Sequence, residues 1–233
     1  MLFAIKHRKS RLNTEHDWPK IQVALDFTDL NQALRVARMV YQGGADWLEA
    51  GTPLIKSVGM GAVEELKKKY PDATIIADLK TLDTGWIETE MAAEAGADIV
   101  SISGLANNRT VTEAVRCAKK HRTRIMGDLL EVPNLIRRAA ELKKLGVNYV
   151  CVHTGIDAQK DQRNEIDRKA LVIGRLAKSV RLPIAAAGGI EACTAWKVVR
   201  AGAKIVIVGT SVTRATDPKR ATTMIWAAIS RSS

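Results

Sequence analysis

Gly44-Ala45-Asp46-Trp47-Leu48-Glu49 is the first of four copies of one phrase. The other copies begin at Gly96, Gly146 and Gly202, so successive copies lie 52, 50 and 56 residues apart. Each copy places a glycine suited to a helix C-terminus before a short turn and an apolar, β-rich run. The repeat therefore predicts a regular alternation of helices and strands along the chain.

Four further apolar runs fall between the copies and complete a set of eight predicted strands. They cover residues 21–25, 74–77, 124–126 and 183–187. All eight runs are continuously apolar, which is typical of strands buried on both faces of a parallel sheet. Eight such strands alternating with eight helical stretches predict a single-domain α/β fold, a (β/α)8 TIM barrel over residues 20–233. A doubly wound open sheet is the alternative, but it rarely has eight even repeats and no Gly-rich loop after its first strand.

The composition is that of an ordinary globular protein. Hydrophobic residues make up 46% of the 233 residues and aromatic residues 4%, so the core must be built from Ala, Val, Ile and Leu. No apolar run approaches the roughly 18 residues of a transmembrane helix, so we expect no membrane span. With 36 Lys and Arg against 25 Asp and Glu, the net charge is +11. Such a charge suits a nucleic acid, an anionic membrane or a phosphorylated substrate, and its spread along the chain favours none of them.

Residues 1–19 are predicted to form a basic leader ahead of the barrel, and the protein is expected to be cytoplasmic. The apolar start of the leader is too short for a secretory signal. Its basic cluster consists of Lys6, His7, Arg8, Lys9 and Arg11. The cysteines are far apart and form no CxxC pair, which argues against a disulfide framework or a zinc site and favours thiols in a reducing compartment. They are Cys117, Cys151 and Cys193.

A polar residue stands at the carboxyl end of six predicted strands. In chain order these residues are Asp26, Glu49, Asp78 (followed by Lys80 and Asp83), Ser101 with Ser103, Asp128 and His153. Any one of them has a structural explanation: Asp26 could cap a turn, and Asp128 could brace a neighbouring loop. Together they would repel and desolvate each other without purpose. Because the chemistry of barrel enzymes gathers at the carboxyl ends of the strands, the set predicts an active site there.

Glu49 and Asp78 end adjacent strands, so their carboxylates can converge on one cation. Two carboxylates with substrate oxygens and waters are the usual ligands of Mg2+. An acid/base pair sharing a proton is the competing interpretation. Lys80 follows Asp78 by two residues and is predicted to project on the same side. Asp83 lies near the start of the next helix, where it could equally serve as an N-terminal charge.

Glycine loops follow the last two predicted strands. Many barrels bind a phosphate at this position through backbone N–H groups, which glycine allows to approach the anion closely. The loops are Ala187-Gly188-Gly189 and Gly209-Thr210. Arg214 could pair with the phosphate or be a surface arginine. The sequence therefore favours a phosphorylated small-molecule substrate.

Residues 78–83, Asp-Leu-Lys-Thr-Leu-Asp, match the DxKxxD signature of the orotidine monophosphate decarboxylase suprafamily. The segments 23–26, 49–56, 153–157 and 187–189 make the chain look most like the 3-hexulose-6-phosphate synthases. This resemblance runs in order over about residues 20 to 230. Two departures lie near the substrate position, namely Gly104–Arg109 after the fourth strand and Gly209-Thr210 after the eighth.

The resemblance distinguishes between the branches of the suprafamily. Members that decarboxylate orotidine monophosphate without metal carry a lysine where this chain has Glu49, whereas Mg2+-dependent members carry glutamate. Among the latter, 3-keto-L-gulonate-6-phosphate decarboxylases place an arginine three residues after the histidine of the sixth strand. Ile156 occupies that position here. The resemblance therefore favours the synthase, with the keto-gulonate decarboxylase as the alternative.

The resemblance also implies a role for each residue. Glu49 and Asp78 would ligate Mg2+, which Mn2+ could replace, and the metal would hold D-ribulose 5-phosphate. His153 would remove a C1 proton to give an enediolate that adds to formaldehyde, forming D-arabino-hex-3-ulose 6-phosphate in the ribulose monophosphate pathway. Lys80 and the metal would offset the developing charge. Asp26 would orient substrate hydroxyls, and Asp83 would reach the neighbouring subunit's site in a homodimer.

A basic nucleic-acid-binding protein is the alternative outside enzymes. The low aromatic content and the lack of a nucleic-acid motif argue against it, and only the leader clusters positive charge.

Overall fold

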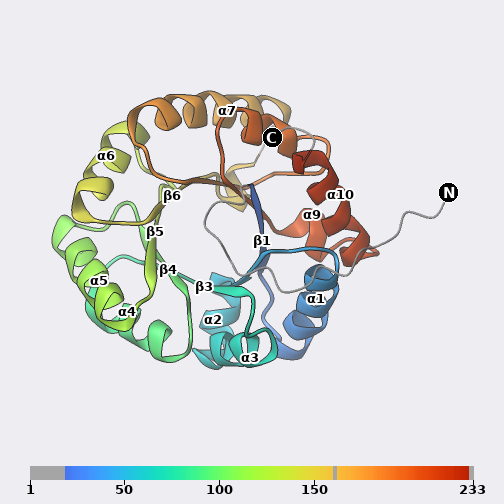
Figure 1. Cartoon of the computed structure of the whole chain (residues 1–233), viewed down its shortest axis with the longest axis horizontal. Helices are drawn as coiled ribbons and strands as arrows, with labels where there is room; N and C mark the ends of the chain where they lie inside the picture. Colours follow the sequence, from blue (N-terminus) through green and yellow to red (C-terminus); the bar gives the residue numbers. More distant parts are fainter. Residues whose placement is uncertain (1–18, 160–161, 231–233) are drawn as a thin grey trace.

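The computed structural model describes residues 19–159 and 162–230, and in them eight parallel strands close into a barrel (Figure 1). The strands are β1 (Lys20–Leu25), β2 (Trp47–Ala50), β3 (Thr74–Thr81), β4 (Ile99–Ser103), β5 (Arg124–Asp128), β6 (Tyr149–His153), β7 (Ile184–Ala187) and β8 (Ile205–Val208). Each strand pairs with its neighbours in sequence, and β1 pairs with β8. The predicted single-domain barrel is confirmed, and the open-sheet alternative is wrong because the sheet has no free edge.

Helices form a ring outside the strands (Figure 1). They are α1 (Leu30–Gln42), α2 (Thr52–Val58), α3 (Gly61–Lys69), α4 (Gly85–Glu94), α5 (Asn108–His121), α6 (Leu135–Leu145), α7 (Gln162–Ser179), α8 (Ala195–Arg200), α9 (Thr210–Thr213) and α10 (Pro218–Ser230), with a 3-10 turn η1 (Ile156–Ala158). The prediction of eight helical stretches is wrong in number. Two helices, α2 and α3, lie between β2 and β3, and two more, α9 and α10, follow β8. Between β2 and β3, Gly59 has a φ of 70°, which ends α2 before α3 begins.

The repeated phrase has a common structural role ahead of β2, β4, β6 and β8. All four of its glycines have positive φ, between 93° and 115°. In three copies the next polar side chain accepts a hydrogen bond from the backbone of the preceding odd-numbered strand: Asp46 from Ile21 N, Asp98 from Ile75 N, and Asn148 from Ile125 N. The fourth copy has Lys204, which keeps only the backbone bond, from its own N–H to Ile184 O. The phrase thus fixes where each even strand starts beside its neighbour.

Two apolar layers hold the barrel together. The outer layer packs the helices against the sheet, and the inner layer fills the barrel with alternate strand residues. In the inner layer Trp47 lies edge-on to Tyr149, with ring centroids 5.6 Å apart. Two residues further along the same strands, Glu49 and Cys151 also point inward. The inner layer therefore closes the barrel beneath the polar carboxyl ends.

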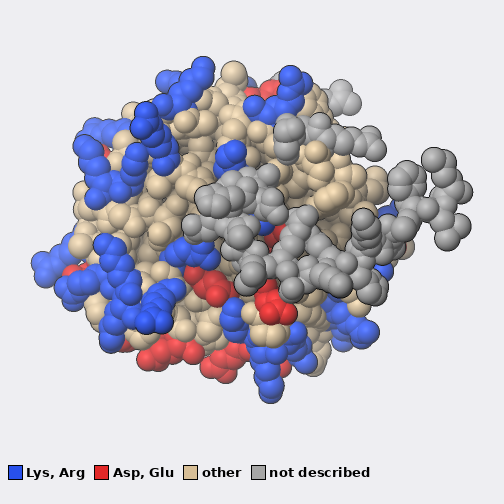
Figure 2. Space-filling view, viewed as in Figure 1, with Lys and Arg blue, Asp and Glu red and all other residues tan. Residues whose placement is uncertain are grey.

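Charge is distributed around the outside of the barrel. On the face shown in Figure 2, Lys and Arg are spread over the outer helices and form no single basic patch. Within the described residues, none of the helices combines the length and the apolar character that crossing a membrane requires. The predicted leader, residues 1–19, falls outside the described residues except for Pro19.

Candidate active site

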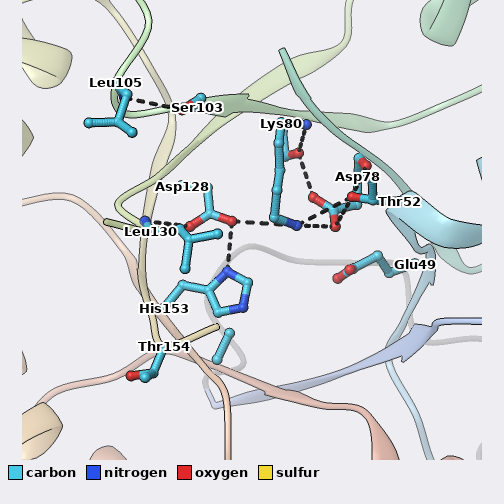
Figure 3. A network of polar contacts seen from close by, with 12 residues as sticks. Glu49, Thr52, Asp78, Lys80, Ser103, Leu105, Asp128, Leu130, His153 and Thr154 are labelled. Atoms are coloured by element: carbon cyan, nitrogen blue, oxygen red, sulfur yellow. Dashed lines mark hydrogen bonds and ion pairs between the residues drawn. The ribbon is translucent and has the colours of Figure 1, made fainter. Parts of the chain in front are cut away.

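The end of β3 carries Asp78 and Lys80 on the same side, as predicted. Between Ala77 and Thr81, β3 advances four residues while β4 advances only two, so β3 bulges. The bulge gives Lys80 a φ of 48°, in the left-handed region that side chains other than glycine rarely adopt. Ser101 holds this conformation, because its Oγ accepts a hydrogen bond from Lys80 N at 2.9 Å. Lys80 Nζ then contacts Asp78 Oδ2 (Figure 3).

Lys80 is the cation of the site and is surrounded by carboxylates. Besides its contact with Asp78, Nζ lies 3.7 Å from Asp128 Oδ2. Burial lowers the pKa of this ammonium, but Asp78, Asp128 and Glu49 raise it by more, so the pKa of Lys80 lies above its ordinary value. Lys80 therefore carries its positive charge at physiological pH.

Asp78 is buried and well supplied with donors. Ser101 Oγ donates to its Oδ1 at 2.7 Å, and Thr52 Oγ1 donates to its Oδ2 at 2.8 Å. Burial raises the pKa of Asp78, but Lys80 and these hydroxyl groups lower it by more, so the pKa lies below its ordinary value. Asp78 is thus a fixed negative charge.

Glu49, on the adjacent strand β2, is buried with much less compensation. Gln22 Nε2 donates a hydrogen bond to its Oε2. Burial raises the pKa of Glu49 well above its ordinary value, and the Asp78 and Asp26 carboxylates raise it further. Gln22 Oε1 is itself buried and has no hydrogen-bond partner among the described residues. A buried carboxylate that forms no ion pair with the described residues, beside a second carboxylate, is a donor set that fits a hard divalent cation.

His153, at the end of β6, faces this group from the other side of Lys80 (Figure 3). Its Nδ1 lies 2.8 Å from Asp128 Oδ2. Because a carboxylate only accepts hydrogen bonds, Nδ1 carries the proton and Nε2 is the basic nitrogen. Asp128 also braces its own loop, rather than the neighbouring loop of the sequence interpretation, since Oδ1 accepts a hydrogen bond from Leu130 N at 3.0 Å.

The glycine loops after β7 and β8 are joined to each other. Gly188 and Gly189 have φ of 90° and 67°. A Cβ at position 188 would lie 2.1 Å from Thr154 O, so only glycine fits there. Ser211 Oγ, in the β8 loop, donates to Ile190 O at 2.8 Å. The two loops therefore form one surface at the rim of the barrel.

A buried lysine lies behind the β7 loop. Lys169, on α7, is 3% exposed, and its Nζ donates to Ala187 O at 2.6 Å and to Gly188 O. Glu165 Oε1 lies 3.6 Å from this ammonium. Burial lowers the pKa of Lys169, and Glu165 only partly offsets the effect. These hydrogen bonds hold two loop carbonyls toward α7.

The remaining predicted residues lie around this centre. Asp26 sits at the rim between Gly51 and Gly209, and partial burial followed by the Asp78 charge raises its pKa. Gly209 and Thr210 lie where β8 passes into α9, and Arg214 is exposed just after α9 with no ion pair within the described residues. Asp83 is exposed and is not brought to the other site residues. It lines a groove of about 270 Å³ at the starts of α4 and α5.

Two supporting residues, Thr52 and Lys169, were missing from the predicted site, and Asp128 was in it without an assigned partner. Asp128 stood among the strand ends, but its partner depends on strand register. Lys169 has a recognisable signal, because it falls between Ile166 and Ile173 on the buried stripe of α7. A lysine on an apolar helix face is expected to have a polar partner in the core.

The orotidine 5'-phosphate decarboxylase / HUMPS family model matches residues 19–225. The chain belongs to this family. It is 37% identical over 198 residues to the 3-hexulose-6-phosphate synthase of Bacillus subtilis (strain 168), covering 85% of this chain and 92% of that one. The resemblance read from the motifs is thus confirmed, as is the expectation of an enzyme of the aldehyde-lyase kind.

Among solved structures, a synthase is more similar to this chain in sequence than a decarboxylase is. The 3-hexulose-6-phosphate synthase from Salmonella typhimurium matches with a TM-score of 0.85 at 32% identity, covering 92% of this chain and all of that one. The 3-keto-L-gulonate-6-phosphate decarboxylase from Vibrio cholerae matches with a TM-score of 0.79 at 27% identity, covering 92% and 99%. The family members named as synthases are thus the nearer of these relatives in sequence.

The environment of Glu49 predicts that Glu49→Gln stabilises the metal-free protein. The change removes a buried charge beside Asp78 and offers an amide donor to Gln22 Oε1. About 1 kcal/mol would raise the melting temperature roughly 2–4 °C in a chain of this size. Because the pKa of Glu49 is raised in the folded state, the wild type loses stability as pH rises above the ordinary value of 4.5. The gain should therefore be small near pH 4 and widen above it in thermal unfolding with chelator. A melting temperature at or below that of the wild type at pH 8 would contradict this account.

Proposed function

We propose that this chain interconverts D-ribulose 5-phosphate plus formaldehyde with D-arabino-hex-3-ulose 6-phosphate in an Mg2+-dependent aldol reaction. The observation that carries the proposal is a buried glutamate at position 49 beside ionised Asp78, with a histidine base facing them. A metal-free decarboxylase of this family would need a cation at position 49. The curated relatives named 3-hexulose-6-phosphate synthase support the same choice.

Glu49 and Asp78 are the residues that would hold Mg2+. When bound, Mg2+ supplies positive charge that stabilises negative charge developing on the substrate oxygens. Asp78 is held ready for this by Thr52 and Ser101, which fix both of its oxygens. Glu49 has only Gln22 to hold it, so ligand binding is the interaction that would compensate its burial.

His153 is the proposed base. Asp128 holds Nδ1–H, which leaves Nε2 to accept the C1 proton of the pentulose and to return it in the reverse direction. Lys80 stays charged throughout and offsets the negative charge left on the substrate. Asp26, at the rim, would accept hydrogen bonds from substrate hydroxyls.

The backbone amides of Gly188, Gly189, Gly209 and Thr210 are proposed to bind the phosphate, with Arg214 pairing from outside. Lys169 supports this role as a positioning residue. By drawing the carbonyls of Ala187 and Gly188 toward α7, it keeps acceptor oxygens away from the anion. Donors would then line the loop surface that faces the phosphate.

The metal assignment predicts loss of activity in chelator and recovery with Mg2+ or Mn2+. The assay couples ribulose 5-phosphate and formaldehyde to hexulose phosphate formation. Glu49→Gln should lower kcat at least ~100-fold, the scale seen when a key electrostatic contact is removed. Mg2+ should also raise the melting temperature of the wild type but not of Glu49→Gln.

Each alternative has its own outcome in this assay. Full activity in chelator would overturn the metal site and favour the acid/base pair of Glu49 and Asp78. Release of carbon dioxide from 3-keto-L-gulonate 6-phosphate, without hexulose phosphate formation, would favour the decarboxylase. Ile156 already argues against that reading, because an arginine is expected at this position in the decarboxylases.

The phosphate assignment predicts that Thr210→Asp raises KM at least ~10-fold with little change in kcat. The new carboxylate would stand at the start of α9 and repel the phosphate. Thr210→Asn is the matched control, since it has a similar size and no charge. Steady-state kinetics on both variants make the comparison, and equal KM values would mean that these loops are ordinary turns.

We also propose that two copies form a homodimer through the β3–α4 and β4–α5 connections. The resemblance implies such a dimer, with Asp83 reaching the partner's site. Four large apolar side chains there are at least 49% exposed: Leu82, Ile87, Met91 and Leu105. Trp86, beside them at the start of α4, contributes less because it is half-buried with Arg116 4.8 Å from its ring centroid. Asp83 lies in the β3–α4 connection, next to Leu82 in sequence, and its side chain is exposed.

The dimer proposal predicts that Ile87→Glu yields a monomer of reduced activity. A charge at a position that is 59% exposed in one chain should leave the fold intact but oppose burial between two chains. Met224→Glu is the control, because Met224 is similarly exposed on α10, on the opposite side of the barrel (Figure 1). Light scattering and activity measurements on both variants show whether only Ile87→Glu disrupts the dimer. A wild type that is fully active as a monomer would refute the dimer.

A further inference from the structure

A second group of metal-ligating side chains lies in the helical layer, on the facing sides of α4 and α5. Cys117 and His121 are four residues apart on α5 and so share one helix face, and Glu90 faces them from α4. One ligand atom from each residue lies within 4.8 Å of the others. The carboxylate and the imidazole are already close, with Glu90 Oε1 3.2 Å from His121 Nε2.

We propose that Glu90, Cys117 and His121 form a site for a borderline-soft divalent ion such as Zn2+, which joins α4 to α5. Thiolate, imidazole and carboxylate are the three ligand types that Zn2+ takes in proteins, with a water completing a tetrahedron. Ligand atoms at about 2.0–2.3 Å from such an ion lie roughly 3.6 Å apart. The three atoms are at most about 1.2 Å farther apart than such an ion requires. Mg2+ prefers oxygen ligands, so this site and the one at Glu49 and Asp78 would select different ions.

The surrounding residues hold two of the ligands in place. Trp86 Nε1 donates to Glu90 Oε2 at 3.1 Å, which leaves Oε1 directed toward His121. Cys117 is fully buried. The two helices are in close contact nearby, since a Cβ at Gly85 would lie 2.1 Å from Thr110 O. The ligands therefore stand on two elements whose separation is fixed.

Lys120 occupies the position of the counter-ion when no metal is bound. Its Nζ lies 3.1 Å from Glu90 Oε1, and its side chain is 58% exposed, so it can swing into solvent. Burial, followed by the Glu90 carboxylate, raises the pKa of the Cys117 thiol. Metal binding would release the thiol proton to solvent and displace the ammonium, so that the ion takes over the charge balance of Glu90.

The cysteine pattern argued against a zinc site because it contains no CxxC pair. That argument covers sites built from paired cysteines. A single cysteine that shares a helix face with a histidine, and meets a carboxylate from the next helix, leaves no such pattern in the sequence.

The test is a titration of the metal-free full-length protein with Co2+ in excess Mg2+. Binding through Cys117 should produce a thiolate-to-cobalt charge-transfer band and the visible spectrum of a tetrahedral ion, both removed by Zn2+. Cys117→Ala should abolish the band, and Cys193→Ala, at an exposed cysteine, should leave it unchanged. His121→Gln serves as a second ligand variant at a partly exposed position and should weaken binding at least ~10-fold.

Lys120→Gln gives the sharpest readout. If the ammonium competes with the metal for Glu90, this variant should bind Co2+ about two- to fivefold more tightly, the range for an exposed ion pair. Zn2+ should likewise raise the melting temperature of the wild type and of Cys193→Ala, but not of Cys117→Ala. A wild type without the thiolate band, a band that survives Cys117→Ala, or weaker binding in Lys120→Gln would each overturn the site.

Discussion

The contacts of Lys80 with Asp78 and Asp128 are the interactions on which the rim of the barrel depends. Four carboxylates converge there, and the Asp78 charge raises the pKa of both Glu49 and Asp26. One ammonium, held against Asp78 and 3.7 Å from Asp128, offsets part of that cost. Its position requires the β3 bulge and a left-handed backbone at Lys80, which is a strained conformation that Ser101 stabilises. The compensation is uneven: Asp78 is paired, while Glu49 is left with Gln22 alone.

The inner apolar layer allows the fold to tolerate these charged groups at the rim. Trp47 and Tyr149 close the barrel beneath Glu49, so water does not reach the carboxylates from that side. The burial of the carboxylates strengthens the charge interactions at the rim and at the same time keeps the pKa of Glu49 high. A fold assembled for stability would place apolar residues at this level. A buried acid that forms no ion pair with the described residues is the kind of local cost that functional sites carry.

The repeated phrase predicted the barrel because its glycine has the same role before every even strand and its polar side chain binds the preceding strand in three of the four copies. The strand-end rule found Glu49, Asp78 and His153 for a similar reason, since parallel strands bring all their carboxyl ends to one rim. The bulge could not be predicted, because apolar and polar residues alternate through residues 77–80 as they would in a regular strand end. The partner of Asp128 depends on strand register, and the second helix after β2 depends on the single positive φ of Gly59. Asp83 matched a motif, yet within one chain its side chain is exposed and lines a groove at the starts of α4 and α5.

Two lysines of the candidate site, half-buried Lys80 and buried Lys169, lie in opposite electrostatic settings. Lys80 is surrounded by carboxylates, which raise its pKa, whereas Lys169 donates to two carbonyls and has its pKa lowered by burial. Lys169 therefore loses its proton more readily than Lys80 does. On the proposed function, a phosphate bound at Gly188 and Gly189 brings negative charge to the loop that Lys169 supports. Binding and protonation then favour each other, because coupling between two sites is reciprocal. The loop would thus hold its donors outward most firmly when the phosphate is present.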